Sequence, residues 1–119
     1  MRWQDAISGR QLAASATAGA LLAAVLFASA AFSQSRYVVS QKGREFNPGA
    51  LSIARGESVL IVNDDADLRH HVYIDSDKFN FDSGDQEPGT KTSILFPTAG
   101  TFKVLCAIHP KMRLVVTVH

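Results

Sequence analysis

The sequence has few cysteines and no excess of charge of either sign. Its single cysteine, Cys106, excludes an internal disulfide framework, and there are no Cys-x-x-Cys pairs of the kind that hold structural zinc. Twelve Lys and Arg residues face 11 Asp and Glu residues, for a formal net charge of +1. Without excess positive charge the chain is poorly equipped to neutralise phosphates, so we expect no nucleic-acid partner.

The length and composition indicate one folded domain. With 46% hydrophobic and 19% charged residues in 119, the chain is neither a disordered tail nor a coiled coil. If the protein is exported, its lone thiol calls for a functional explanation, because a free cysteine outside the cytoplasm is liable to oxidation.

Residues 1–33 have the layout of a secretory signal. Arg2 and Arg10 precede an uncharged, Ala-rich run from Gln11 to Phe32 that ends in small residues. We predict a signal peptide over 1–33, export to the periplasm, and a mature domain over 34–119. The alternative is an uncleaved membrane anchor, and only in that case do we expect contact with a membrane.

The remainder of the chain reads as short strands separated by turns. Apolar and β-branched residues alternate or cluster in seven segments, and Gly, Pro, Asn and Asp fall between them; no stretch keeps a helical period for three turns. The pattern predicts an all-β sandwich or barrel. The seven segments are residues 36–41, 50–55, 57–63, 70–75, 90–96, 101–107 and 112–119.

A thiol, an imidazole and a thioether follow one another at three-residue intervals in Cys106, His109 and Met112. A straight strand would turn neighbours of this spacing to opposite faces, and Pro110 would break a helix. A tight loop between two strands is the arrangement that lets the three side chains converge. Taken singly, each has a plainer interpretation: a buried cysteine, a core histidine, a packing methionine.

A metal held by this loop needs a ligand from elsewhere, and His70 is the best candidate. Along segment 70–75, His70 shares the apolar face with Val72 and Ile74, whereas His71 lies on the polar face. His119 is the last residue, and we expect it to fray. Two histidines, one thiolate and a weak methionine ligand form the set that suits copper in electron transfer.

These residues resemble the cupredoxins, the small blue copper proteins, in particular the amicyanin and plastocyanin-like group. The similarity covers about residues 44–119. The resemblance implies a Greek-key β-sandwich of seven or eight strands with one type 1 copper ion held by His70, Cys106, His109 and Met112. The phrases that carry it are Phe46-Asn47-Pro48-Gly49, Asn63-Asp64-Asp65, His70-His71-Val72, and Gly100-Thr101-Phe102 through Cys106, His109, Pro110 and Met112.

Two positions depart from the family pattern. His71 stands where Asn is common, and Ala107 where Thr or Ser is common, so both ends of a contact between the ligand loops are changed. The resemblance also implies a docking rim around His109, made of Ala107, Ile108, Pro110 and Lys111.

The function predicted from these residues is one-electron transfer between redox partner proteins by a monomer. The alternative is a copper-binding module for storage, delivery or sensing. We do not expect an enzyme, because Met112 covers the position that a catalytic metal leaves open for substrate and the sequence shows no nucleophile–base constellation.

Overall fold

The computed structural model describes residues 35–119, so the predicted signal over 1–33 lies outside the described residues. Within 35–119 all regular structure is β-structure, which confirms the predicted fold class. The nine strands of this range are β1 Tyr37–Lys42, β2 Glu45–Asn47, β3 Ala50–Ile53, β4 Ser58–Asn63, β5 Val72–Ile74, β6 Phe81–Asp82, β7 Lys91–Leu95, β8 Gly100–Cys106 and β9 Arg113–Val118.

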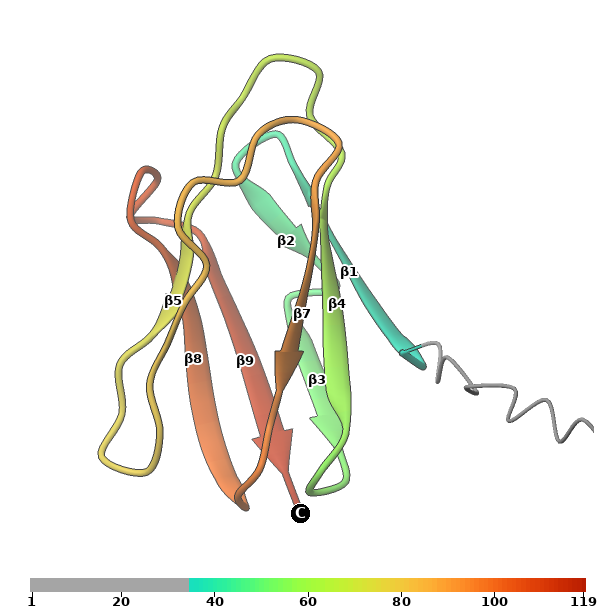
Figure 1. Cartoon of the computed structure of the whole chain (residues 1–119), viewed down its shortest axis with the longest axis vertical. Coiled ribbons are helices and arrows are strands. Elements are labelled where there is room, and N and C mark those ends of the chain that lie inside the picture. Colours follow the sequence, from blue (N-terminus) through green and yellow to red (C-terminus); the bar gives the residue numbers. More distant parts are fainter. Residues whose placement is uncertain (1–34) are drawn as a thin grey trace, which may run out of the picture. The chain divides into compact units, whose positions relative to one another are not determined.

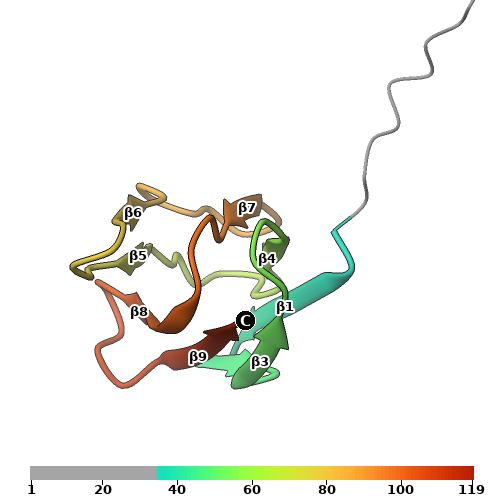
Figure 2. The ribbon, with the colours of Figure 1, turned by 90° about the horizontal axis from the view of Figure 1, so that it is seen from below.

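The strands form two facing sheets, as the sandwich prediction requires. One sheet has the order β2-β1-β4-β7 and the other the order β3-β9-β8-β5-β6 (Figures 1 and 2). β1 pairs with β4 and β3 with β9 in parallel, and the remaining pairs are antiparallel. Strands that follow one another in the sequence therefore often lie in different sheets, and the chain crosses between the sheets as in the Greek-key sandwich that the resemblance implied.

Two of the nine strands, β2 and β6, fall in none of the seven predicted segments, and both are very short. β2 buries a single side chain, Phe46, and β6 has only two residues. Neither is long enough to show an alternating pattern in the sequence. β2 forms because Gly43 and Arg44 make a two-residue turn with φ of 61° and 64°, the left-handed geometry that closes tight hairpins.

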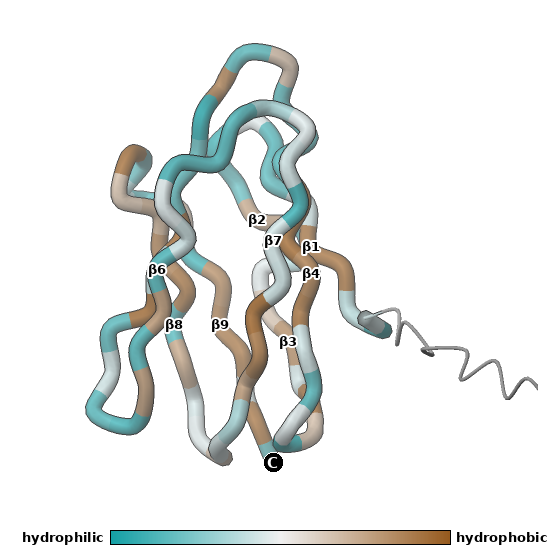
Figure 3. The backbone as a smooth tube through the Cα atoms, viewed as in Figure 1, coloured by the Kyte–Doolittle hydropathy of each residue, from teal (hydrophilic) through white to brown (hydrophobic). Residues whose placement is uncertain are grey.

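The core is built by the inward face of each strand. Alternate residues of β4, β8 and β9 are buried, and Phe79, Phe96 and Phe102 pack edge-to-face or tilted against one another. Figure 3 shows apolar segments along the strands and mostly polar loops at the upper end, with apolar stretches in the β4–β5 loop and at the tip of the β8–β9 loop. That apolar tip lies beside the site described next.

No helix in the part of the chain that the structure covers is long and apolar enough to cross a membrane. The loops that carry the predicted ligands, β4–β5 and β8–β9, lie at the end of the sandwich opposite the C-terminus (Figure 1). Strand β8 ends there with Cys106, and β9 begins there after Met112. The fold therefore delivers residues far apart in the sequence to one pole.

Candidate metal centre

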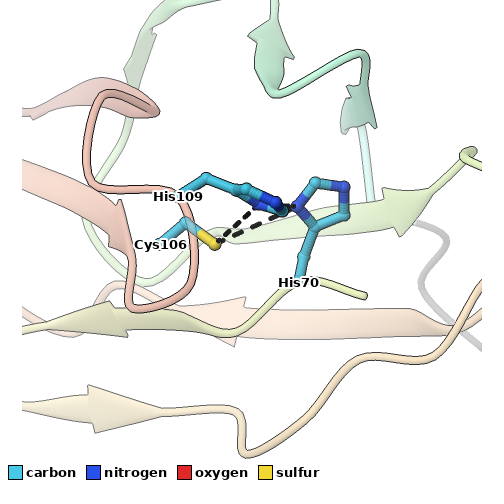
Figure 4. Close-up of side chains that lie close together, drawn as sticks. All are labelled: His70, Cys106 and His109. Atoms are coloured by element: carbon cyan, nitrogen blue, oxygen red, sulfur yellow. Dashed lines mark hydrogen bonds between the residues drawn. The ribbon is translucent and has the colours of Figure 1, made fainter. Parts of the chain in front are cut away.

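Three predicted residues converge at this pole, with their nitrogen and sulfur atoms facing one another (Figure 4). The Sγ atom of Cys106 lies 3.9 Å from Nδ1 of His70 and 3.8 Å from Nδ1 of His109. The two Nδ1 atoms are 3.3 Å apart. Among the described residues this is the one group of three or more His, Cys, Asp or Glu side chains close enough to share a metal ion.

These separations fit a single ion at the centre of a triangle. Metal bonds of about 2.0 Å to nitrogen and about 2.3 Å to sulfur, in a trigonal plane, require the nitrogens to be about 3.5 Å apart and the sulfur about 3.7 Å from each. The structure has 3.3, 3.8 and 3.9 Å. The donor set is a thiolate with two imidazoles, which accommodates both Cu(I) and Cu(II).

His70 is fixed by its backbone before its ring is considered. It exchanges two backbone hydrogen bonds with Gln86, N to O at 3.0 and 2.7 Å, in an isolated β-bridge. The Gln86 side chain is itself buried and joins Gln41 and Thr92 through 2.8 Å hydrogen bonds. His70 is fully buried and shares its face with buried Val72, as the period of two predicted.

The β8–β9 connection is the tight loop that the spacing predicted. The Met112 N–H donates to the His109 carbonyl at 3.0 Å, which closes the turn around Pro110. Cys106 and Met112 are 2% and 1% exposed, so the thiol and the thioether belong to the interior. His109 between them is half-buried.

The two ligand loops are joined even though both side chains of the expected contact are changed. The Ala107 N–H donates to the His71 carbonyl at 2.8 Å, a link that needs neither side chain. The His71 ring turns instead to the β6 side, with Nε2 2.6 Å from Asp82 Oδ1 and Nδ1 3.4 Å from Asp85 Oδ1. The hydrogen bond from the Gly84 N–H and then that from His71 lower the pKa of Asp82.

Asp65 is a site residue that sequence reasoning missed. Its Oδ2 lies 2.6 Å from Nε2 of His70, on the side of the ring away from Cys106 and His109. Burial raises the pKa of Asp65, but the hydrogen bonds from the Gly43 N–H and from His70 outweigh that effect and lower it. The sequence signal was faint, because Asp65 belongs to a run of acidic residues that resembles an ordinary solvated loop.

The surroundings of His109 lower its pKa and favour its neutral form. Burial is the main cause that lowers its pKa, and the nearby charges of His70 and Arg44 lower it further, while Asp65 opposes them. A neutral imidazole is the form that can bind a metal.

The residues predicted to form a docking rim around His109 are all exposed. Ile108 is 44% exposed, and Ala107, Pro110 and Lys111 are also exposed, so a rim with an apolar centre lies beside the half-buried imidazole of His109.

His119 was expected to fray, but the structure holds it by hydrogen bonds. Its N–H donates to Ile53, its carbonyl accepts from Arg55, and its ring lies 3.3 Å from Ser52, at the C-terminal end of the sandwich.

Comparisons with known proteins agree with this geometry. The family model described as "Copper binding proteins, plastocyanin/azurin family" matches residues 34–119. No curated protein is significantly similar in sequence.

Solved structures share the fold. A reduced amicyanin with a Trp-to-Tyr substitution is 24% identical with a TM-score of 0.66, covering 72% of this chain and 84% of that one. An oxidised amicyanin with a Pro-to-Gly substitution is 22% identical with the same TM-score, covering 76% and 88%. The copper-containing nitrite reductase of Thermus scotoductus SA-01 is 28% identical with a TM-score of 0.64, covering 70% of this chain but 22% of the enzyme.

Proposed function

Because the chain belongs to the plastocyanin/azurin family of copper-binding proteins, we propose that it is an exported one-electron carrier with a single type 1 copper ion. The observation that carries this proposal is the triangle of His70 Nδ1, His109 Nδ1 and Cys106 Sγ. The distances between these three atoms are close to those expected when three ligands surround one ion in a plane. Copper bound there supplies a centre that cycles between Cu(II) and Cu(I).

The protein's contribution is to hold the ligands still. His70 is anchored by two backbone bonds to Gln86, Cys106 ends a paired strand, and the His109 loop is closed by the Met112 N–H. Ligands held in this way move little when the oxidation state changes, so little reorganisation opposes electron transfer. Buried Met112 completes the set as a weak fourth ligand in this proposal.

The half-buried imidazole of His109 is the proposed exit for the electron. The rim around it, with Ile108 at its centre, offers a small apolar surface for a redox partner protein. A brief encounter suits a carrier, since a tightly bound partner would slow its turnover.

The proposal includes removal of residues 1–33 and a periplasmic mature domain over 34–119 that acts as a monomer. Retention of the first segment would instead tether the same domain to the membrane. In both cases copper is acquired after export, since the signal resembles that of the general route for unfolded chains.

Electron transfer is favoured over copper storage or delivery by the state of His71. Both ring nitrogens of His71 lie near carboxylates, Asp82 and Asp85, so this imidazole is already engaged beside the copper site. Electron transfer is also favoured over catalysis, because the proposed ligand Met112 is buried and would cover the position that a catalytic metal leaves open for substrate. The nitrite reductase shares only a fold segment that spans 22% of its chain.

Two rates test the carrier proposal on copper-loaded full-length protein. Electron self-exchange between oxidised and reduced forms, followed by NMR line broadening, should be fast, while loss of Cu(I) to a competing chelator should be slow. The Cys106→Ser variant serves as the control and should show no type 1 signal. Slow self-exchange together with rapid loss of Cu(I) to the chelator would instead support a role in copper delivery.

A further inference from the structure

Asp65 stands out in the described structure because its carboxylate touches a metal-binding histidine from behind. Its side chain is only 9% exposed, and the His70 ring that it contacts is fully buried. The 2.6 Å distance between Asp65 Oδ2 and His70 Nε2 is that of a strong, charge-assisted hydrogen bond.

This contact decides which nitrogen of His70 carries its proton. A carboxylate oxygen accepts hydrogen bonds, so the proton of the neutral ring lies on Nε2 and the lone pair on Nδ1. Nδ1 is the atom that faces Cys106 and His109. The acid therefore presents the lone pair of His70 to the position of the metal.

The carboxylate is held in place by a different part of the fold. Its second oxygen, Oδ1, accepts from the N–H of Gly43 at 3.0 Å, in the turn between β1 and β2. The Asp65 N–H in turn donates to Oδ1 of buried Asn63 at the end of β4, also at 3.0 Å. Two donors, Gly43 and His70, thus converge on one side chain, and a carboxylate offers an oxygen to each.

We propose that Asp65 is a positioning residue of the copper site, which orients His70 and whose negative charge favours Cu(II) over Cu(I). It acts through the ring and does not touch the metal. An imidazole that donates to a carboxylate is a more basic ligand, and a buried negative charge stabilises the more positive oxidation state. Asp65 therefore lowers the reduction potential. The proposal rests on copper binding at the proposed site, not on the identity of a redox partner.

Two variants separate the charge of Asp65 from its hydrogen bonds. Asp65→Asn removes the charge and leaves one acceptor oxygen for two donors, whereas Asp65→Ala removes both acceptors. Asp67→Asn is the matched control, since Asp67 is an exposed acid of the same loop. It removes the same unit of charge without the contact to His70.

Voltammetry and copper titration of the full-length protein give the first test. Loss of an outer partner of this kind weakens metal binding roughly 10- to 100-fold, and we expect that loss in Asp65→Ala. Both Asp65 variants should raise the reduction potential, by about 59 mV for each tenfold change in the oxidised-to-reduced equilibrium. Asp67→Asn should stay near wild type. If the Asp65 variants match Asp67→Asn in potential and affinity, the proposal is wrong.

A second test needs no variant, so it survives if Asp65→Ala fails to fold. In wild-type protein loaded with diamagnetic Cu(I), long-range ¹H–¹⁵N NMR should find the His70 proton on Nε2, strongly shifted downfield by its short hydrogen bond. A proton on Nδ1, or an Nε2–H that exchanges freely with water, would overturn the positioning role. Wild-type protein without a type 1 copper spectrum would sink the proposed function instead, so the two failures are distinguishable.

Discussion

At the scale of single residues, one substitution tests the proposed role of Met112 as a weak fourth ligand. Met112 is buried beside the ligand loop, and leucine has a similar volume, so Met112→Leu should cost the fold less than about 1.5 kcal/mol. Three ligands remain, and copper should stay bound. Loss of the thioether donor disfavours Cu(II), so the reduction potential should rise. Voltammetry with metal analysis checks this, and complete loss of copper would show that the assignment of Met112 as a weak fourth ligand is wrong.

Individual ligands were accessible from the sequence for two physical reasons. A period of two separates His70 from its neighbour His71 without any tertiary information, and Pro110 after His109 excludes a helix for the loop. Asp65 was not accessible in this way. Its contact with His70 depends on the Gly43 turn and the end of β4, which come together only in the folded sandwich.

At the scale of elements, the β1–β2 hairpin carries a strained residue. Arg44 has a φ of 64°, in the left-handed region that costs a side chain about 1–2 kcal/mol. Arg44→Gly should therefore stabilise the protein by roughly 0.5–1 kcal/mol, after allowance for the greater freedom of glycine in the unfolded chain. Urea unfolding measures this. Arg44→Lys, which keeps charge and strain, should change nothing, and equal stability of all three proteins would contradict the account.

The strands were predictable wherever they lie within a longer patterned segment. All seven predicted segments overlap a strand of the structure, and even short β3 and β5 lie in longer alternating stretches that leave a readable pattern. β2 and β6 were not predicted, because these short strands form by pairing with β1 and β5 and their own sequences carry no strand pattern. The parallel pairs β1–β4 and β3–β9 were likewise beyond sequence reasoning, since pairing partners are set by the whole fold.

At the scale of the whole molecule, the exposed apolar rim should govern encounters between copies and with partners. In Ile108→Glu, both copies that meet in self-exchange carry a new negative charge beside His109. The two charges repel each other, so electron self-exchange should slow by roughly tenfold or more at low salt. Leu95→Glu is the matched control, because Leu95 is 55% exposed on β7, outside the rim. Visible spectra of both variants should match wild type. Equal slowing by both substitutions would argue against the rim.

Acid should destabilise the copper-free protein in two stages. The pKa of His109 is lowered from 6.5, so below pH 6.5 the unfolded chain takes up a proton before the folded one and stability falls. The pKa values of Asp65 and Asp82 are lowered from 3.8, so a further loss begins as pH falls below that value. Urea unfolding across this range should show both stages. His109→Gln should flatten the first stage, and an unchanged slope would contradict this assignment.

The central claim is that His70, Cys106 and His109 hold one copper ion through sulfur and nitrogen at one pole of a β-sandwich. The most direct measurement is titration of the full-length protein with Cu(II), followed by visible absorption and electron paramagnetic resonance. The account predicts an intense thiolate-to-Cu(II) band that saturates at one equivalent, bleaches on reduction and is lost in Cys106→Ser. A colourless adduct, or a band that persists without the thiol, would contradict it.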